Sequence, residues 1–231
     1  IILPHKFINI QTMRKLFLSM VFGVLASGIV CAQESEEKLY HNDFHKWQVR
    51  LRGILVTPDE SANIGLIGGD AAISKSFMPE LDFTYYFTKN IAAELILGTT
   101  NHDVKAINTA VGNLDLGDVW LLPPTLTLQY HWNVEENVRP YVGAGFNYTI
   151  FYNAANGPIA DNVDYENSFS PAMQFGIDFD ISKRWFINID AKYLFLSTDV
   201  EVDATSALGA VVNAEVDINP FIAGIGIGFK L

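Results

Sequence analysis

The segment "WLLPPTLTLQYHW", residues 120–132, decides the fold because apolar and polar side chains alternate along it. One side carries mainly Leu126, Leu128, Tyr130 and Trp132, and the other carries Thr125, Thr127, Gln129 and His131. A period of two residues is typical of a β-strand with two different faces. Proline cannot donate a hydrogen bond to a sheet, so we expect Pro123 and Pro124 at a strand end or an unpaired edge. The segment therefore predicts a strand with one apolar face that ends in aromatic residues.

The first 32 residues have the pattern of an export signal. The longest apolar run, residues 16–30, follows Arg14 and Lys15 and ends in Val30-Cys31-Ala32. It is shorter than the roughly 20 residues of a membrane-spanning helix, and its charge and small final residues favour a signal peptide. We predict that residues 1–32 are an upstream extension and signal peptide that is removed, which leaves residues 33–231 as one domain. A lipoprotein modified at Cys31 is the alternative.

The mature chain is acidic and contains no cysteine, because Cys31 is the only one in the sequence. Removing Lys6, Arg14 and Lys15 from 15 basic residues leaves 12 against 26 acidic residues, a net charge of −14. An exported chain without disulfides must gain its stability from packing or from a membrane. The negative charge argues against nucleic acid as a partner, because nucleic-acid binding needs a basic surface.

Eight segments share the alternation of the opening stretch. They are residues 47–57, 77–87, 90–101, 120–132, 140–152, 168–181, 184–197 and 216–231. The connections between them alternate between short ones and the long stretches 58–76, 102–119, 153–167 and 198–215, which are rich in Gly, Asn and Asp. This order predicts an all-β, eight-stranded up-and-down antiparallel barrel with one plain end and one elaborated end.

The size of the side chains decides which face of the barrel is apolar. A soluble barrel has its apolar face inside, whereas a transmembrane barrel has it outside. The apolar faces are large and aromatic and would overfill an eight-stranded interior, whereas the opposite faces carry glycine and charge. Aromatic residues also gather at both ends of the apolar faces, as expected at two membrane interfaces. The sequence therefore predicts a transmembrane barrel in the outer membrane, formed by residues 33–231.

The inward residues divide into a polar and an apolar group. Toward the short turns they form a predicted polar plug of Arg50, Arg52, Asp82, Glu94 and His131. We expect the two arginines to pair with Glu80, Asp82 or Glu94, because buried charges need partners. Toward the long connections the inward residues are apolar and predict a ligand pocket of Ile54, Val56, Met78, Ile96, Leu121, Phe151, Leu194 and Leu196. The alternative is that these apolar residues simply fill the barrel.

The route of a solute through such a barrel is constrained. An eight-stranded lumen leaves no broad water channel, so a general diffusion porin is not expected. A polar plug also blocks a straight path for an apolar molecule. Pro123 and Pro124 could loosen strand pairing and open a gap sideways into the lipid, although prolines at a strand end are the simpler interpretation.

The sequence contains little that indicates catalysis. It has no G-x-S-x-G or H-E-x-x-H motif, and the histidines of the mature chain are scattered at His41, His45, His102 and His131. We therefore predict no enzyme activity, no metal site and no cofactor. The acidic residues of the long connections are most simply solvated, with a shared divalent cation at lipopolysaccharide phosphates as the alternative.

The chain resembles the outer-membrane protein W (OmpW) family over almost all of its mature length. The resemblance lies in "FTYYFTKNIAAELIL" at 83–97, "LPPTLTLQYHW" at 122–132, "RPYVGAGFNYTIFY" at 139–152 and "RWFINIDAKYL" at 184–194. It implies a monomeric eight-stranded barrel in a Gram-negative outer membrane that takes up small hydrophobic molecules, without catalysis or cofactor. It also implies an aromatic pocket residue near the start of the sixth strand, which here is Phe169; the alternation directs Phe169 outward, unless Pro171 shifts the phase of the strand. The family usually ends in phenylalanine, whereas this chain ends in Leu231.

We therefore expect a barrel that passes or binds small hydrophobic molecules through an apolar pocket in its lumen. The alternative is a structural barrel that stabilises the membrane or presents its loops. The expected partners are outer-membrane lipid, lipopolysaccharide and a small hydrophobic solute.

Overall fold

The computed structural model describes residues 44–132 and 136–231. The predicted upstream extension and signal peptide, residues 1–32, lie outside the described residues, as does His41. Among the described residues, no helix has the length and apolar character needed to cross a bilayer.

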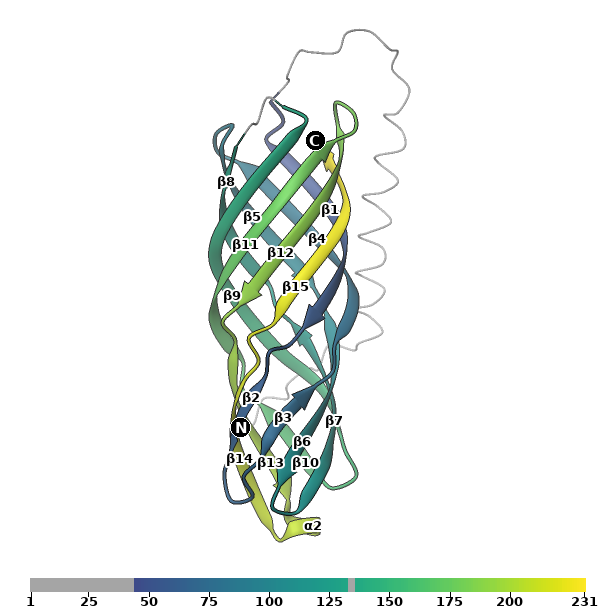
Figure 1. The fold of residues 1–231 in the computed structure, drawn as a ribbon, viewed down its shortest axis with the longest axis vertical. Coiled ribbons are helices and arrows are strands. Elements are labelled where there is room, and N and C mark those ends of the chain that lie inside the picture. Colours follow the sequence, from purple (N-terminus) through teal and green to yellow (C-terminus); the bar gives the residue numbers. More distant parts are fainter. Residues whose placement is uncertain (1–43, 133–135) are drawn as a thin grey trace, which may run out of the picture. The chain divides into compact units, whose positions relative to one another are not determined.

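Eight antiparallel strands close into a barrel in the order of the sequence (Figure 1). They are β1 (Trp47–Thr57), β4 (Ser76–Tyr86), β5 (Ile91–Gly98), β8 (Thr125–His131), β9 (Val138–Asn156), β11 (Ser168–Asp180), β12 (Trp185–Leu194) and β15 (Phe221–Lys230). The last strand pairs with the first, with Gln48 opposite Lys230 and Thr57 opposite Phe221. The predicted eight-stranded antiparallel barrel is confirmed.

The long connections are not irregular loops, and this corrects the sequence analysis. They contain β2 (Ser61–Ile64), β3 (Asp70–Ile73), β6 (Thr100–Thr109), β7 (Gly112–Leu122), β10 (Asn162–Tyr165), β13 (Ser197–Ala204), α2 (Thr205–Leu208) and β14 (Ala210–Asp217). Strands β3, β6 and β7 continue the barrel sheet through the pairing of β7 with β9, and the order β10-β13-β14-β2 forms a second sheet. These seven strands prolong the barrel at one end and are called the extension here (Figure 1).

The predicted strand of residues 120–132 is two strands. Strand β7 ends at Leu122 and β8 begins at Thr125, so the two prolines lie at the junction. The physical reason is the one that places proline at strand ends, since neither residue has an N–H to donate. Both strands nevertheless pair with the same long strand, β9, with Leu122 opposite Ile150 and Thr125 opposite Asn147.

The apolar side chains of the barrel strands face outward. On β8, Leu128 is 59% exposed, whereas the inward-facing His131 is 0% exposed. The exposed aromatic residues include Trp47, Phe87 and Trp132 near the short turns and Phe77, Phe195 and Phe221 near the extension. Apolar side chains outside and polar ones inside are the arrangement of a transmembrane barrel. Outer-membrane barrels have short periplasmic turns, so the extension lies on the extracellular side.

Two inward glycines make room for aromatic rings in the narrow lumen. A Cβ added at Gly176 would clash with the Tyr141 ring, and one added at Gly228 would clash with the Phe186 ring. Gly176 lies directly opposite Tyr141 in the β9–β11 pairing. The glycines of the polar faces therefore allow large rings to fit beside the buried charges.

Candidate functional site

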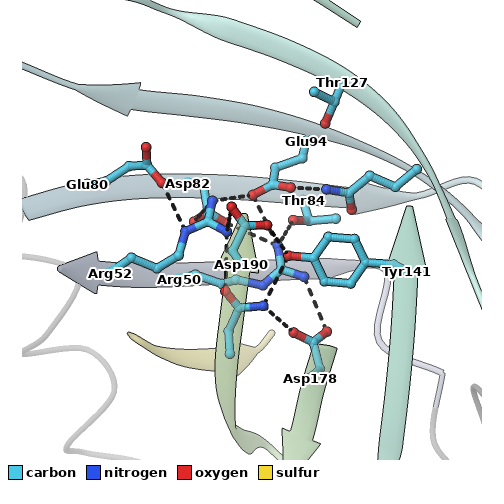
Figure 2. A network of polar contacts seen from close by, with 12 residues as sticks. Arg50, Arg52, Glu80, Asp82, Thr84, Glu94, Thr127, Tyr141, Asp178 and Asp190 are labelled. Atoms are coloured by element: carbon cyan, nitrogen blue, oxygen red, sulfur yellow. Dashed lines mark hydrogen bonds and ion pairs between the residues drawn. The ribbon is translucent and has the colours of Figure 1, made fainter. Parts of the chain in front are cut away.

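Arg50 forms the centre of the polar plug, because β1 aims its side chain into the lumen (Figure 2). Its Nη1 lies 2.7 Å from Thr84 Oγ1, 3.2 Å from Asp82 Oδ1 and 3.3 Å from Glu94 Oε1. Its Nη2 lies 3.3 Å from Asp178 Oδ2. All of these charged side chains are fully buried, so the ion pairs form without access to water.

Arg52 joins a second set of carboxylates two residues further along the same face of β1. Its Nη2 lies 2.7 Å from Glu94 Oε1 and 2.8 Å from Asp82 Oδ2, and its Nε lies 3.0 Å from Glu80 Oε1. On the other side of the lumen its Nη1 lies 3.3 Å from Asp190 Oδ1. The two arginines pair with Glu80, Asp82 and Glu94, as expected. They also pair with Asp178 and Asp190, which the sequence analysis did not name as their partners.

Amides and a histidine complete the plug. Glu94 accepts hydrogen bonds from Gln129 and, at 3.0 Å, from Gln174 Nε2. His131 is fully buried, lies 3.2 Å through Nδ1 from the Tyr86 hydroxyl, and stacks on the Tyr141 ring at 4.8 Å. The plug thus ties together strands on all sides of the lumen, and its complete burial closes the straight path through the barrel.

Directions are given with the extracellular end, where the extension lies, as the top, which is the bottom of Figure 1. In this sense a lower cavity lies directly above the plug. It encloses about 530 Å³ with its mouth included, and its lining includes Ile54, Val56, Ile96, Leu121, Leu194 and Leu196. Its floor is polar, where Lys192 Nζ donates a hydrogen bond of 2.5 Å to Glu80 Oε1. The lower cavity therefore has apolar walls and an ion pair at its base.

An upper cavity lies between the two sheets of the extension. It encloses about 880 Å³ with its mouth included and is lined almost wholly by apolar side chains, among them Ile73, Val119, Phe151, Val200, Val212 and Val216. Leu121 and His102 line both cavities, so the two spaces meet at these residues. Together they form an apolar region that runs from the extension down to the plug.

Most of the predicted pocket residues lie where the alternation placed them. Six of them line the lower cavity, and Leu121 and Phe151 line the upper one. Met78 is half-buried opposite Ile54 in the β1–β4 pairing and lines neither cavity. The five plug residues Arg50, Arg52, Asp82, Glu94 and His131 are all buried together.

Phe169 does not belong to the lumen, which corrects the position implied by the family resemblance. Its side chain is 67% exposed and stacks on the Phe146 ring at 5.2 Å. Pro171 does not shift the phase of β11, because Phe169 remains paired with Tyr148 in an unbroken register. The alternation itself had placed Phe169 outward.

The wall of the lower cavity has a gap in its hydrogen bonding beside Pro123. Strand β5 pairs with β8 up to Ile96 and Thr125, and β6 pairs with β7 from Thr100 and Leu121. Between these pairs, Gly98 would face Pro123, but no backbone hydrogen bond joins the two residues. Pro123 itself lines the lower cavity. At this point next to the apolar space the barrel wall therefore lacks a backbone hydrogen bond, and beside it Thr99 Oγ1 donates to Leu121 O at 3.1 Å.

The sequence analysis missed the contribution of the extension to the cavity. Val200, Val202, Val212 and Val216 supply much of its wall. Their signal was present, since apolar residues alternate with acidic or polar ones in residues 199–204 and 211–217. His102 was noted only as a scattered histidine, although it is buried where the cavities meet.

The described residues contain no group of three or more His, Cys, Asp and Glu side chains arranged to hold a metal ion. Outside the membrane, burial raises the pKa of Tyr165, whose ring stacks on Phe151 in the upper cavity at 5.5 Å. The site therefore consists of an apolar space above a closed, charged plug.

Residues 45–231 match the model of the OmpW family. The chain belongs to the OmpW family. This is a family of outer-membrane barrel proteins and not of known enzymes, and the chain is accordingly an outer-membrane protein.

Relatives and solved structures agree with this assignment. The uncharacterized outer-membrane protein y4mB of Sinorhizobium fredii is 42% identical over 80% of this chain and 79% of its own. The dibenzothiophene metabolism operon protein DoxH of a Pseudomonas species is 32% identical over 79% of this chain and 87% of its own. The crystal structure of OprG, an outer-membrane protein of Pseudomonas aeruginosa, has a TM-score of 0.75 at 27% identity and covers 81% of this chain and 96% of that chain.

Proposed function

We propose that this OmpW-family barrel binds small hydrophobic molecules at its extracellular end and conducts them through the outer membrane. The observation that carries the proposal is the upper cavity of about 880 Å³, whose lining is almost wholly apolar. Concave sites lined mainly by hydrophobic and aromatic side chains are typical of small-molecule binding. An apolar molecule transferred there from water gains about 25 cal/mol for each Å² that it buries.

The closed plug favours an exit through the wall. An apolar solute that reaches the lower cavity meets the Lys192–Glu80 ion pair and the buried arginines, which it cannot solvate. Pro123, where the backbone hydrogen bond to Gly98 is missing, lines this same cavity in the wall that separates it from the lipid. We propose that the solute leaves there and enters the hydrocarbon of the membrane, where its transfer is favourable.

A relative supports an apolar solute. The DoxH protein is named for a dibenzothiophene metabolism operon, and dibenzothiophene is an uncharged aromatic molecule. A solute of that chemical class would fit a cavity lined by Val, Ile, Leu and Phe side chains.

Uptake of an apolar dye tests the proposal. N-phenyl-1-naphthylamine fluoresces once it reaches hydrocarbon, and its rate of uptake would be measured in intact Gram-negative cells that lack other proteins of this family. We expect the Ile54→Asp, Leu121→Asp double variant to lower the rate to that of cells without the protein, because each carboxylate would lie in the apolar region. Heat-dependent migration on a gel would confirm that each variant forms a barrel.

A bulky substitution on one strand gives a matched pair that keeps the barrel wall intact. Ala214 lines the upper cavity, whereas its neighbour Asn213 on β14 is exposed on the opposite face. Ala214→Trp would fill the cavity and slow uptake, and Asn213→Trp would not. Equal uptake by the wild type, the double variant and Ala214→Trp would instead favour a structural role for the barrel.

A further inference from the structure

A buried histidine lies where the two apolar cavities meet. His102, on β6 of the extension, is only 3% exposed and lines both cavities. A polar ring where two apolar cavities meet needs a reason, because burial of an unpaired polar group is unfavourable. Its hydrogen bonding indicates what that reason is.

The contact between His102 and Ser74 fixes the tautomer of the ring. His102 Nδ1 lies 2.6 Å from the carbonyl oxygen of Ser74. A carbonyl oxygen only accepts hydrogen bonds, so Nδ1 carries the proton and donates. Burial lowers the pKa of His102, so the ring is neutral at neutral pH. In a neutral ring with a protonated Nδ1, Nε2 is a hydrogen-bond acceptor.

That acceptor has no partner in the part of the chain that the structure describes. His102 makes one side-chain hydrogen bond, the one from Nδ1. Nε2 is also not one of the completely enclosed polar atoms that lack a partner, so it keeps some accessible surface, and the ring that carries it lines both cavities. Among the other polar residues of the lining, Thr125, Thr198 and Lys192 already donate to Pro123 O, Glu166 O and Glu80 Oε1, whereas Thr100 in the lower cavity and Lys105 and Tyr165 in the upper cavity are further polar residues.

We propose that the solute of this barrel is an apolar molecule with one hydroxyl group, an alcohol or a phenol, whose O–H donates to Nε2 of His102 while its hydrocarbon part occupies the adjoining cavities. Thr100, two residues before His102 on the same buried face of β6, lines the lower cavity and can donate its hydroxyl to the same solute oxygen. This inference rests on the proposed function and narrows its solute class.

A pair of probes that differ in one hydroxyl group tests the inference. 2-Naphthol and naphthalene have the same ring system, and only the first can donate a hydrogen bond. Their binding to the wild-type barrel in phosphatidylcholine nanodiscs would be measured by equilibrium dialysis against empty nanodiscs, which corrects for partition into the lipid.

Two variants separate the acceptor from the structural role of the ring. In His102→Asn, the amide N–H can still donate to Ser74 O, but nothing reaches the position of Nε2. In His102→Gln, the longer side chain can place its carbonyl oxygen near that position and restore an acceptor. His45→Phe, at a half-buried histidine bonded to Leu231 O at the opposite end of the barrel, is the control for a change of histidine in general.

We expect His102→Asn to weaken 2-naphthol binding roughly fivefold, the equivalent of about 1 kcal/mol for one net hydrogen bond, and to leave naphthalene binding unchanged. His102→Gln should recover part of the loss, and His45→Phe should change neither probe. If both probes bind the wild type but His102→Asn affects them equally or not at all, the inference is wrong and the proposed function stands. If neither probe binds the wild type beyond empty nanodiscs, both are wrong.

Discussion

At the scale of single residues, the stability of this barrel depends on how its buried charges are paired. The single side chain of Arg52 contacts four carboxylates, and all of these side chains are buried. The carboxylates are those of Glu80, Asp82, Glu94 and Asp190. Such a network is stable only while each charge has its partners, because the desolvation of an unpaired buried ion costs several kcal/mol. The plug is therefore expected to tolerate the loss of a single partner poorly.

Replacing Arg52 by methionine should destabilise the barrel strongly. Arg52→Met keeps much of the side-chain volume but leaves four buried carboxylates with fewer cations, and removal of one partner from a buried pair costs about 3–5 kcal/mol. The measurement is the free energy of unfolding in urea, for the barrel folded in lipid vesicles. Arg184→Met, at an exposed residue of a short turn, should stay within about 0.5 kcal/mol of the wild type. A loss of less than about 1 kcal/mol in Arg52→Met would contradict this account of the plug.

The state of His102 predicts a pH dependence of binding. Burial is the main cause that lowers the pKa of His102 below its usual value of about 6.5, while the nearby carboxylates Asp103 and Glu60 act in the opposite direction. Nε2 is therefore still an acceptor at pH 6.5, and it becomes protonated only at more acidic pH. We expect wild-type affinity for 2-naphthol to change little between pH 8 and pH 7 and to fall as the pH decreases below about 6.5.

Dialysis at a series of pH values measures this effect, and His102→Asn supplies the control. The variant has no group that titrates at this position, so its weak 2-naphthol binding should not change further in acid. An identical acid-induced fall in the wild type and His102→Asn would mean that groups other than His102 cause it.

At the scale of the strands, the two prolines of the opening segment have different consequences. Residue 124 faces β9, since Tyr148 N donates to Pro124 O at 3.0 Å. Successive residues of a strand direct their backbone groups to opposite neighbours, so residue 123 faces Gly98 of β5. Pro123 therefore removes the donor that would close the gap beside the lower cavity, whereas Pro124 removes a donor on the intact side.

This difference predicts unequal effects of two similar substitutions. Pro123→Thr restores an N–H toward Gly98, should complete the ladder between β5 and β8, and should slow dye uptake several-fold if the solute leaves through the wall. Pro124→Thr restores an N–H toward β9 and should leave the rate close to that of the wild type. The same uptake assay in intact cells measures both, and equal rates in the two variants would contradict exit at this gap.

The alternation of side chains predicted the barrel strands but not the extension, and the reason is physical. On β8 the pattern of Thr125, Thr127 and Gln129 against Leu126 and Leu128 is uninterrupted, so strand and faces were predicted together. On β13 the same period is present in Val200 and Val202 against Asp199 and Glu201, but it was hidden in stretches rich in Gly, Asn and Asp.

The site could be predicted only in part, because alternation shows a face and not the neighbours across the lumen. It placed Arg50 and Arg52 inward and named three of their partners, but the reach of Asp178 and Asp190 across the barrel depends on closure of the sheet. The acceptor at His102 depends on Ser74, which lies 28 residues away in the sequence. The family resemblance placed Phe169 in the pocket, whereas its phase on β11 directs it to the lipid.

For the molecule as a whole, the apolar face of the sheet changes from the outside to the inside at the membrane boundary. In the barrel strands apolar side chains such as Leu126 and Ile225 are exposed to lipid, and charged ones are inside. In the extension Val202 and Val216 are buried, and Asp199 and Glu201 are exposed to water. The inversion follows the solvent, because lipid accepts apolar side chains that water excludes. It also produces the upper cavity, since the apolar faces of the extension strands turn inward and line that space.

The barrel and its extension should therefore be separable. Within the barrel, β12 pairs directly with β15, and Tyr193 is opposite Phe221. This pairing does not include β13 or β14, which lie between the two strands in the sequence. Replacing residues 197–217 by an Asn-Gly turn should leave a folded, heat-modifiable barrel but remove one wall of the upper cavity, so that 2-naphthol and naphthalene binding are both lost. Trimming only residues 205–209 to Asn-Gly keeps Val202 and Val212 and should preserve binding. If the larger deletion still binds both probes, the upper cavity is not the binding site, and the lower cavity alone must hold the solute.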